Sequence, residues 1–424
     1  MSKLAGGFLV GHATHPDWRM ALALAAAQID AARASQQPAP FAHPSSAAAA
    51  PVEAGVSTLG LVYFSDRYAP DALALLQELH QRWPGVAWVG CPAVGVAATG
   101  VEYFDEPALA LMLCDLPEGS FEVFSGARPL SGQAAHTALV HADPQTPDLA
   151  ELVDELSQRV DTGYLFGGAV SARNGGAQVA EGWWQGGLSG VGFGPQVRLV
   201  SRVTQGCQPV GPERVVTAAE GHVVTELDGL PALTCLLQDL GVDLRDPRKA
   251  LPVLRATLVG LTDADSALLG RGGQFGPDVR VRHLVGLDPG RQAVAVAARV
   301  EPGMRLAFCQ RHTEAARRDL VRICSEIREE VETAAEEAAA AAHGGALDSA
   351  AGRAPGAPPA PAIRGAVYIS CNGRGGPHFG APSAELKIVQ RALGDVPLVG
   401  FFAAGEIARR HLYGYTGVLT VFPG

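Results

Sequence analysis

One segment, Ser370–Gly376, constrains the fold and the function of this chain more than any other. It follows the apolar run Ala366–Ile369, which predicts a buried strand, and it ends in glycines that interrupt regular structure. A thiol (Cys371), an amide (Asn372) and a guanidinium (Arg374) therefore meet where a strand opens into a loop. Strand ends are the usual place for ligand sites in α/β sheets. The alternative is a tight turn in which the guanidinium holds a carboxylate of the protein itself.

The composition indicates a folded protein without an anionic macromolecular partner. The 424 residues are enough for two or three domains, and 47% hydrophobic against 18% charged residues exclude global disorder. The net charge is −10 and no basic block is present, which argues against nucleic acid and against an anionic membrane surface as partners. No stretch reaches the roughly 18 uncharged apolar residues of a membrane span.

The cysteines indicate a reducing compartment. There are seven of them, scattered and without a C-x-x-C pair, which argues against a disulfide framework and against a structural zinc site. The amino terminus does not have the pattern of a secretory signal. Gly270–Gly273 is a lone glycine cluster, and neither a dinucleotide fingerprint nor a phosphate loop is present. We therefore expect a cytoplasmic protein with no metal and no cofactor.

Hydrophobic periodicity predicts an α/β fold with mixed parallel and antiparallel sheets and flanking helices. The helices are predicted at residues 17–34, 71–82, 149–160, 230–240, 312–342 and 385–393. The strands include residues 59–64, 86–89, 366–369, 398–402 and 418–422. Residues 188–193 and 197–203 are predicted to form a hairpin. The Ala/Pro-rich stretch at about 335–363 is predicted to be a flexible insertion.

A glycine-centred motif recurs along the chain. Val89–Gly95 resembles Phe166–Ala169, and both resemble Val399–Gly405. In each, an apolar strand breaks at a glycine, which lets backbone approach backbone or ligand closely. The recurrence predicts that two halves of the chain share one topology. A chance likeness among glycine- and alanine-rich turns is the alternative.

Two carboxylates extend the candidate ligand site. Glu406 follows the glycine-rich break at Gly405, and Glu385 begins a predicted helix. Either could hold an ammonium group while Arg374 holds a carboxylate with its bidentate fork, so together they would suit a zwitterion such as an amino acid. The alternative is an internal ion pair of Arg374 with Glu385 or Glu406.

Gly168 and Cys207 complete the candidate ligand contacts. Gly168 belongs to the recurring glycine motif. Cys207 lies in Gly206–Pro212, whose backbone amides could line a cleft between two domains, although an interdomain turn explains the segment equally.

Cys371 is also a weak candidate for a catalytic nucleophile. Catalysis requires a lowered thiol pKa and a base within reach, and His378 and His411 are the nearest histidines in sequence. No protease or transferase signature surrounds the thiol, and a buried inert cysteine is the commoner case.

Taken in order, these motifs resemble the FIST family, named from F-box and intracellular signal-transduction proteins. The resemblance rests on Val89–Cys91 with Gly95, Phe166–Gly168, Gly206–Pro212, Glu226–Ala232, Val281–His283 with Gly286, Ser370–Gly375, Phe379, Glu385 and Gly400–Glu406. It covers nearly the whole chain. It implies two related domains, an amino-terminal FIST domain at 1–205 and a carboxyl-terminal FIST domain at 206–424.

The resemblance implies a sensory module that binds a small polar metabolite, such as an amino acid, and reports to a signalling output. No kinase, cyclase, methyl-accepting or F-box segment is present in this sequence, so we expect a separate signalling protein as partner. An enzyme that uses Cys371, and an interaction scaffold without ligand, are the alternatives. The family transfers no catalytic residues, and the ligand contacts expected from side-chain chemistry are Cys371, Asn372, Arg374, Glu385, Glu406, Gly405, Gly168 and Cys207.

Overall fold

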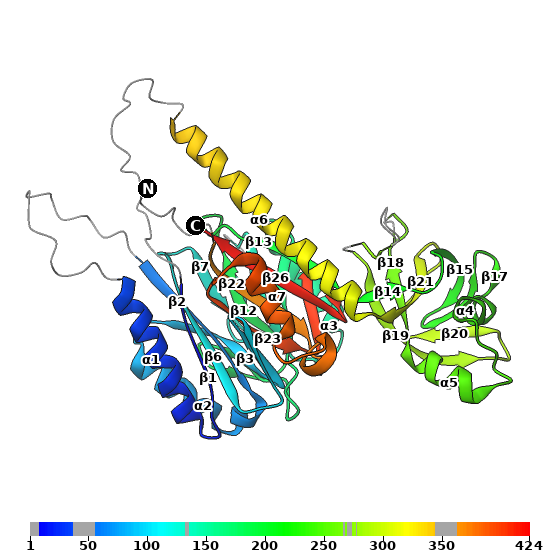
Figure 1. Cartoon of the computed structure of the whole chain (residues 1–424), viewed down its shortest axis with the longest axis horizontal. Coiled ribbons are helices and arrows are strands. Elements are labelled where there is room, and N and C mark those ends of the chain that lie inside the picture. Colours follow the sequence, from blue (N-terminus) through cyan, green and yellow to red (C-terminus); the bar gives the residue numbers. More distant parts are fainter. Residues whose placement is uncertain are drawn as a thin grey trace, which may run out of the picture. The chain divides into compact units, whose positions relative to one another are not determined.

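The computed structural model describes residues 8–36, 56–131, 135–265, 268, 274–276, 278–343 and 363–424 (Figure 1). It confirms a mixed α/β fold with parallel and antiparallel strands. The chain divides into two compact units. Unit 1 comprises Met1–Val203, Leu320–Leu412 and Gly417–Gly424, and unit 2 comprises Thr204–Asp319 and Tyr413–Thr416.

Unit 1 contains three copies of one strand arrangement. In each copy the four main strands lie in the order first, last, second, third across the sheet. The second and third strands are parallel. The first copy consists of β1 (Leu9–Thr14), β2 (Val56–Ser65), β3 (Ala87–Ala93) and β6 (Ala108–Pro117). The second consists of β7 (Phe121–Phe124), β8 (Thr137–Ala142), β9 (Tyr164–Ala169) and β12 (Leu188–Phe193). The third consists of β13 (Val200–Gln205), β22 (Ile363–Cys371), β23 (Leu398–Ala403) and β26 (Thr416–Pro423).

Each copy also gives two short strands to the sheet of another copy. The first copy adds β4 (Gly95–Ala98) and β5 (Val101–Phe104) beside β23 of the third. The second adds β10 (Gln178–Ala180) and β11 (Trp183–Trp184) beside β3 of the first. The third adds β24 (Gly405–Arg409) and β25 (His411–Tyr413) beside β9 of the second. The result is three six-stranded sheets, none of which is complete without another copy.

The recurring glycine motif marks the same position in all three copies. Each glycine lies opposite a residue of the parallel neighbouring strand, in the pairs Gly90–Val62, Gly167–Val140 and Gly400–Tyr368. A Cβ atom on these glycines would lie 1.7, 1.9 and 1.7 Å from the carbonyl oxygens of those partners. The backbones approach so closely that only glycine fits. The predicted repeat is thus present, but as three copies within unit 1 and not as two halves of the chain.

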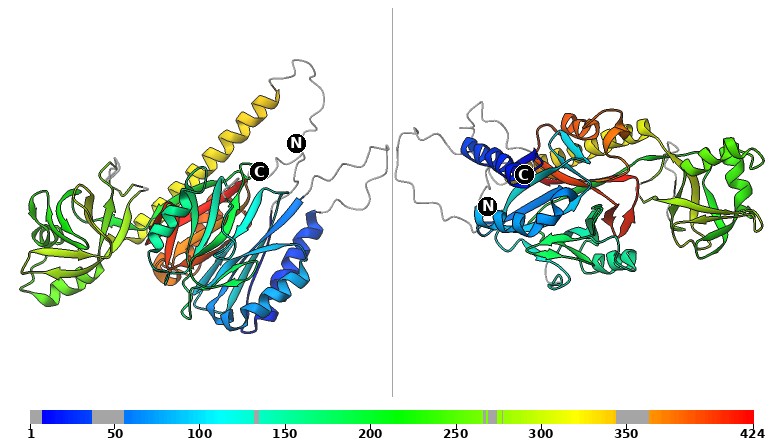
Figure 2. Two further views of the ribbon diagram at one scale, coloured as in Figure 1. Left: turned by 180° about the vertical axis from the view of Figure 1, so that it is seen from behind. Right: turned by 90° about the horizontal axis from the view of Figure 1, so that it is seen from below.

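Helices connect the parallel strands and cover the outer faces of the sheets. They are α2 (Ala72–Arg82), α3 (Leu149–Ser157) and α7 (Ala384–Leu393), one in each copy. Figure 2 shows α1 (Trp18–Gln36) beside α2 on the first sheet, where Ile29 and Leu75 pack in one apolar cluster with Leu111. These helices form because their apolar residues recur with helical spacing and make one buried face.

Two sequence predictions about this unit are wrong. The strands at 188–193 and 197–203 do not form a hairpin, because β12 pairs with β7 and β8 while β13 lies beside β26 in another sheet. The predicted flexible insertion at 335–363 begins too early, because α6 (Thr313–His343) continues through its first part. Residues 344–362, like the glycine cluster Gly270–Gly273, lie outside the described residues.

Unit 2 contains an eight-stranded sheet with two helices. Its strands are β14 (Cys207–Pro209), β15 (Arg214–Glu220), β16 (Val223–Leu227), β17 (Leu230–Pro231), β18 (Thr257–Thr262), β19 (Arg280–Asp288), β20 (Ala293–Val296) and β21 (Arg305–Arg311). Leu233 and Leu236 of α4 (Ala232–Leu240) and Leu254 of α5 (Pro247–Ala256) pack in its apolar core.

The compact units do not follow the predicted division at 205/206. The chain enters unit 2 at Thr204, close to that boundary, but it returns to unit 1 at Leu320. The reason is that the third sheet of unit 1 needs β22, β23 and β26 from the carboxyl-terminal half. In Figure 1 the red strands of this half accordingly lie in one unit with the blue and cyan strands.

Candidate functional site

The carboxyl ends of parallel strands from all three copies meet in unit 1. Backbone bonds join these ends: the Asn372 amide donates to the Ala403 carbonyl (2.8 Å), and the Ala404 amide donates to the Ala169 carbonyl (2.9 Å). Asp66 follows β2 at the same edge, and Arg173 follows β9. This edge is where α/β sheets usually bind ligands.

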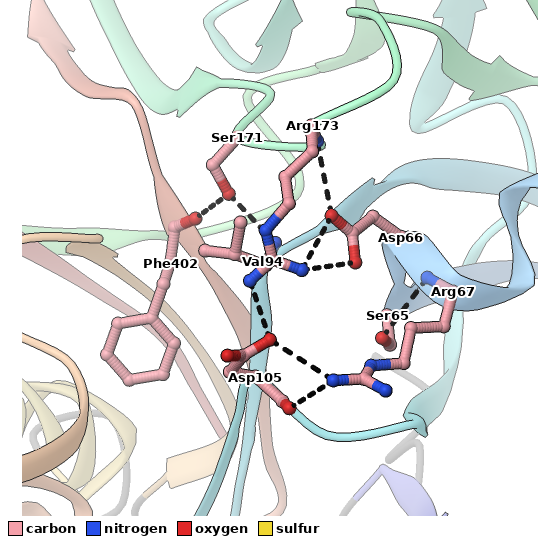
Figure 3. Close-up of polar contacts among 8 residues, drawn as sticks. All are labelled: Ser65, Asp66, Arg67, Val94, Asp105, Ser171, Arg173 and Phe402. Atoms are coloured by element: carbon pink, nitrogen blue, oxygen red, sulfur yellow. Dashed lines mark hydrogen bonds and ion pairs between the residues drawn. The ribbon is translucent and has the colours of Figure 1, made fainter. Parts of the chain in front are cut away.

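A network of two arginines and two aspartates occupies this edge (Figure 3). Arg173 Nη1 lies 3.3 Å from Asp66 Oδ2, and Arg173 Nη2 lies 2.6 Å from Asp105 Oδ1. Arg67 Nη2 approaches the same Asp105 oxygen at 3.3 Å and donates to the Asp105 carbonyl at 2.9 Å. The formal charges cancel, so the network is stable without an added ion but offers both signs of charge to a ligand.

The network is buried at one end and open at the other. The Asp66 side chain is 4% exposed, whereas the side chains of Arg173 and Asp105 are 50% and 56% exposed. Hydrogen bonding from Arg173 lowers the pKa of Asp105, and the same contact raises the pKa of Arg173. Both groups therefore stay charged around neutral pH. Asp66 also accepts a hydrogen bond from the Arg173 backbone amide (3.1 Å), which fixes the backbone position from which the Arg173 side chain extends.

Ser171 joins the three copies two residues before Arg173. Its Oγ accepts from the Val94 amide of the first copy (3.1 Å) and donates to the Phe402 carbonyl of the third copy. Figure 3 shows this hydroxyl between the two other chain segments. Because the residue is 9% exposed, these bonds are shielded from water, and a displacement of this segment would disturb both neighbouring copies.

Cys371 and Asn372 lie at the same edge, as expected from the sequence. Cys371 ends β22 and is 7% exposed, with its Sγ 3.9 Å from Asn372 Oδ1, whereas Asn372 is exposed. The loop then reaches Gly375, where an added Cβ would lie 2.2 Å from the ring of Phe104. Since Asp105 follows Phe104 directly, this loop adjoins the charged network.

Arg374 and Glu385 form an internal ion pair, so the predicted zwitterion contacts are wrong. Their side chains are 1% and 0% exposed, with Nε and Nη2 of Arg374 at 2.9 and 2.7 Å from Glu385 Oε1. Tyr368 Oη (2.7 Å) and Ser370 Oγ (3.1 Å) donate to the same carboxylate. Burial by itself would lower the pKa of Arg374, but Glu385 raises it overall. The alternative stated from the sequence, an internal pair, is confirmed.

The other predicted ligand contacts are also interior. Glu406 is 0% exposed and lies opposite Gly168 in the pairing of β24 with β9. A Cβ on Gly168 would lie 2.7 Å from that of Ala403, so this glycine serves the close packing of strands. Gly405 is buried at the start of β24. Cys207 is 2% exposed in an apolar cluster of unit 2.

No local sequence pattern indicated the charged network. Asp66, Asp105 and the segment Ser171–Arg173 lie far apart in the chain and in no shared motif. One signal was available for three of them: Asp66 directly follows an apolar strand, and Ser171 and Arg173 lie within four positions after another. Within the described ranges no group of three or more His, Cys, Asp or Glu side chains could hold a metal ion. No described helix has the length and apolar character needed to cross a membrane.

Comparison with known families accounts for most of the chain. The model of the FIST N domain matches residues 58–230, and the model of the FIST C domain matches residues 232–409. This chain belongs to the FIST family. FIST domains are generally sensory domains of signal transduction. The matched FIST boundary near residue 231 lies inside unit 2, so it is not a boundary between the compact units.

FIST relatives occur in mycobacteria. The chain is 30% identical over 432 residues to "Uncharacterized protein Rv0628c" of Mycobacterium tuberculosis, which covers 97% of this chain and 98% of that protein. It is 30% identical over 384 residues to "Uncharacterized protein Mb0898c" of Mycobacterium bovis, which covers 86% and 89% of the two chains.

Proposed function

We propose that this FIST protein is a sensor that binds a small polar metabolite, such as an amino acid, at the strand-end edge of unit 1. The observation that carries the proposal is the half-exposed pair Arg173–Asp105, at the strand-end edge where Asn372 is also exposed. A guanidinium can hold a carboxylate through two hydrogen bonds, and a carboxylate can hold an ammonium group. A ligand with both groups could replace the Arg173–Asp105 bond without leaving either charge unpaired.

The position of Arg173 supports a sensory role for such binding. The segment that carries it is tied through Ser171 to the first and third copies, and through Asp66 to the end of β2. A ligand changes the equilibrium between two states only if it binds them with different affinity. A guest that draws Arg173 away from Asp105 would stabilise the state in which these inter-copy contacts are rearranged. We further propose that a separate cytoplasmic signalling protein detects that state.

The proposal is tested by ligand-induced thermal stabilisation. The standard amino acids and small dicarboxylates are screened against the full chain and against Arg173→Gln and Asn372→Ala. Arg159→Gln, at an exposed helix-end position, is the matched control. A true ligand at about 100 times its Kd stabilises the wild type by about 2.7 kcal/mol. We expect this stabilisation to persist in the control and to vanish in Arg173→Gln.

Asn372→Ala leaves the charged network intact. It therefore tests binding at the strand-end site even if Arg173→Gln folds poorly. A ligand that stabilises all four proteins equally binds elsewhere, and the strand-end site would then be abandoned. The same holds if no compound of the panel stabilises the wild type.

A further inference from the structure

A pocket of unit 1 lies at the amino ends of β8 and β9 and thus away from the strand-end edge. Its volume is about 450 Å³, within the range of about 300–1,000 Å³ that is typical of small-molecule pockets. Val197, Leu199 and Val200 supply apolar lining, and Glu330 of α6 contributes from another element. The pocket is therefore assembled from segments that are distant in sequence.

Hydroxyl groups are concentrated on the lining of this pocket. Five of its residues carry one, namely Thr137, Thr162, Tyr164, Ser201 and Thr420. Four of them form two neighbouring pairs: Thr137 Oγ1 lies 3.5 Å from Thr162 Oγ1, and Ser201 Oγ lies 2.8 Å from Thr420 Oγ1. A hydroxyl can donate one hydrogen bond and accept two, and that of Thr162 already donates to the His136 carbonyl and accepts from the Tyr164 amide. Such a lining suits a ligand with several hydroxyl or carbonyl oxygens.

The two arginines of the pocket differ in their partners. Arg202 is neutralised, because its Nε lies 3.3 Å from Glu326 and its Nη2 lies 2.5 Å from Glu330. Its Nη1 donates to the Ser201 carbonyl (2.9 Å). Arg198 is exposed, and no ion pair involves it within the described part of the chain. Arg198 is thus the charged lining residue without an ion pair in the described residues, whereas Arg202 and its two glutamates together carry one negative charge.

Arg198 also borders a second hollow along α6, and four glutamates line it, namely Glu326, Glu329, Glu330 and Glu337. These carboxylates restrict where an anion can sit. An anionic group would be repelled from the α6 side and would bind on the hydroxyl side of Arg198, away from most of these carboxylates.

We propose that this pocket binds a hydroxylated organic anion, with its anionic group on Arg198 and its oxygens on the hydroxyls of Thr137, Thr162 and Ser201. The site is independent of the proposed strand-end site, because the two share no residue. It would give unit 1 a second small-molecule input from a different chemical class.

Ribose 5-phosphate and tartrate are the probes for this site, with neutral ribose and inorganic phosphate as comparisons. Binding to the full chain is measured by titration calorimetry. We expect saturable binding of at least one of the two anions, weaker binding of phosphate and no binding of ribose. Arg198→Gln should lower the affinity for the anion about tenfold or more, as the loss of a charged hydrogen bond predicts.

Two further variants test whether the anion binds in this pocket and not at another arginine of the surface. Thr137→Val removes a lining hydroxyl at nearly constant volume and should also weaken binding, whereas Arg33→Gln, an exposed arginine of α1, should leave it unchanged. Arg173→Gln should not affect anion binding either. A negative result for one of the two proposed sites therefore leaves the proposal for the other site standing. The proposal is overturned if neither anion binds, or if Arg198→Gln binds as tightly as the wild type.

Discussion

Glu102 and Ser383 hold each other by reciprocal hydrogen bonds. Glu102 Oε1 accepts from the Ser383 backbone amide (2.9 Å), and Ser383 Oγ accepts from the Glu102 backbone amide (3.1 Å). Glu102 lies on β5 of the first copy, and Ser383 is the N-cap residue that precedes α7 of the third copy, with φ +59°. The contact therefore fixes a strand of one copy to a helix of another.

This contact predicts a pH-dependent stability. Burial raises the pKa of Glu102 to about 7, and the nearby Glu385 adds to this, whereas the Ser383 amide and Lys387 oppose it. The second carboxyl oxygen, Oε2, is buried without a hydrogen-bond partner in the described structure. The folded pKa exceeds the unfolded value of about 4.3, so the folded state binds the proton more tightly. The contribution to stability is full below about pH 4.3 and is lost as the pH rises through about 7.

Glu102→Gln measures this contribution, because glutamine keeps the carbonyl acceptor but cannot ionise. We expect the thermal midpoint of the variant, relative to that of the wild type, to rise between pH 5 and pH 8 and then to level off. An equal difference at all pH values in this range would contradict the assignment.

Removing Arg374 should strongly destabilise unit 1. Arg374→Met leaves the Glu385 carboxylate buried without its cation, and the loss of one partner of a buried pair typically costs about 3–5 kcal/mol. All five tryptophans lie in unit 1, so urea denaturation followed by tryptophan fluorescence reports on this unit.

Two other variants show whether the buried charge is the cause. Arg374→Met combined with Glu385→Gln should recover part of the loss, because no charge then remains uncompensated. Arg82→Met, which breaks an exposed pair with Asp30, should cost at most about 1 kcal/mol. A small effect of Arg374→Met would show that the pair is open to water.

The glycines of the recurring motif should not tolerate alanine. A Cβ at Gly400 would lie 1.7 Å from the Tyr368 carbonyl oxygen. Strands β22 and β23 cannot move apart to make room without breaking the backbone hydrogen bonds between them. We expect Gly400→Ala to cost more than about 4 kcal/mol, which in practice means loss of soluble protein. Gly126→Ala is the control, because its Cβ would meet nothing within 4 Å. Normal yield and stability of Gly400→Ala would refute this packing.

Cys371 should be the first cysteine to react in the folded protein. It is 7% exposed, whereas the other six are at most 2% exposed, and burial raises the pKa of thiols such as Cys91 and Cys114. Alkylation of the folded protein with iodoacetamide, followed by peptide mass spectrometry, gives the order in which the cysteines react. Equal labelling of Cys91 would argue against the described core.

The same experiment addresses the nucleophile hypothesis. If Cys371 is activated by a histidine, its labelling should slow in His378→Ala or His411→Ala. Unchanged rates in both variants would leave its exposure as the reason for its reactivity.

The fold class could be predicted from sequence because periodicity is a local property. Six helices were predicted within a few residues of their bounds, and each has one apolar face. Helix α5 was not predicted, because Pro252 lies within it and a proline argues against a helix at that position. The exchange of strands between copies could not be predicted, because pairs such as Val96 with Phe401 join distant parts of the chain.

The candidate site was predicted only in part for the same reason. Cys371 and Asn372 were found because they directly follow a strand that local pattern reveals. The pairing of Arg374 with Glu385 was foreseen as an alternative, but only burial could decide between an internal partner and a ligand. Arg173 meets Asp66 and Asp105 through crossings between sheets, of which the sequence carries no local sign.

The circular sharing of strands implies that this molecule cannot be shortened at its family boundary. A polypeptide severed after residue 230 would lack β22, β23 and β26, and so would leave β4 and β5 without the sheet that receives them. Its exposed edges would invite aggregation. The two severed pieces should instead regain a native structure only when they are produced together, as interlocking parts that complement each other.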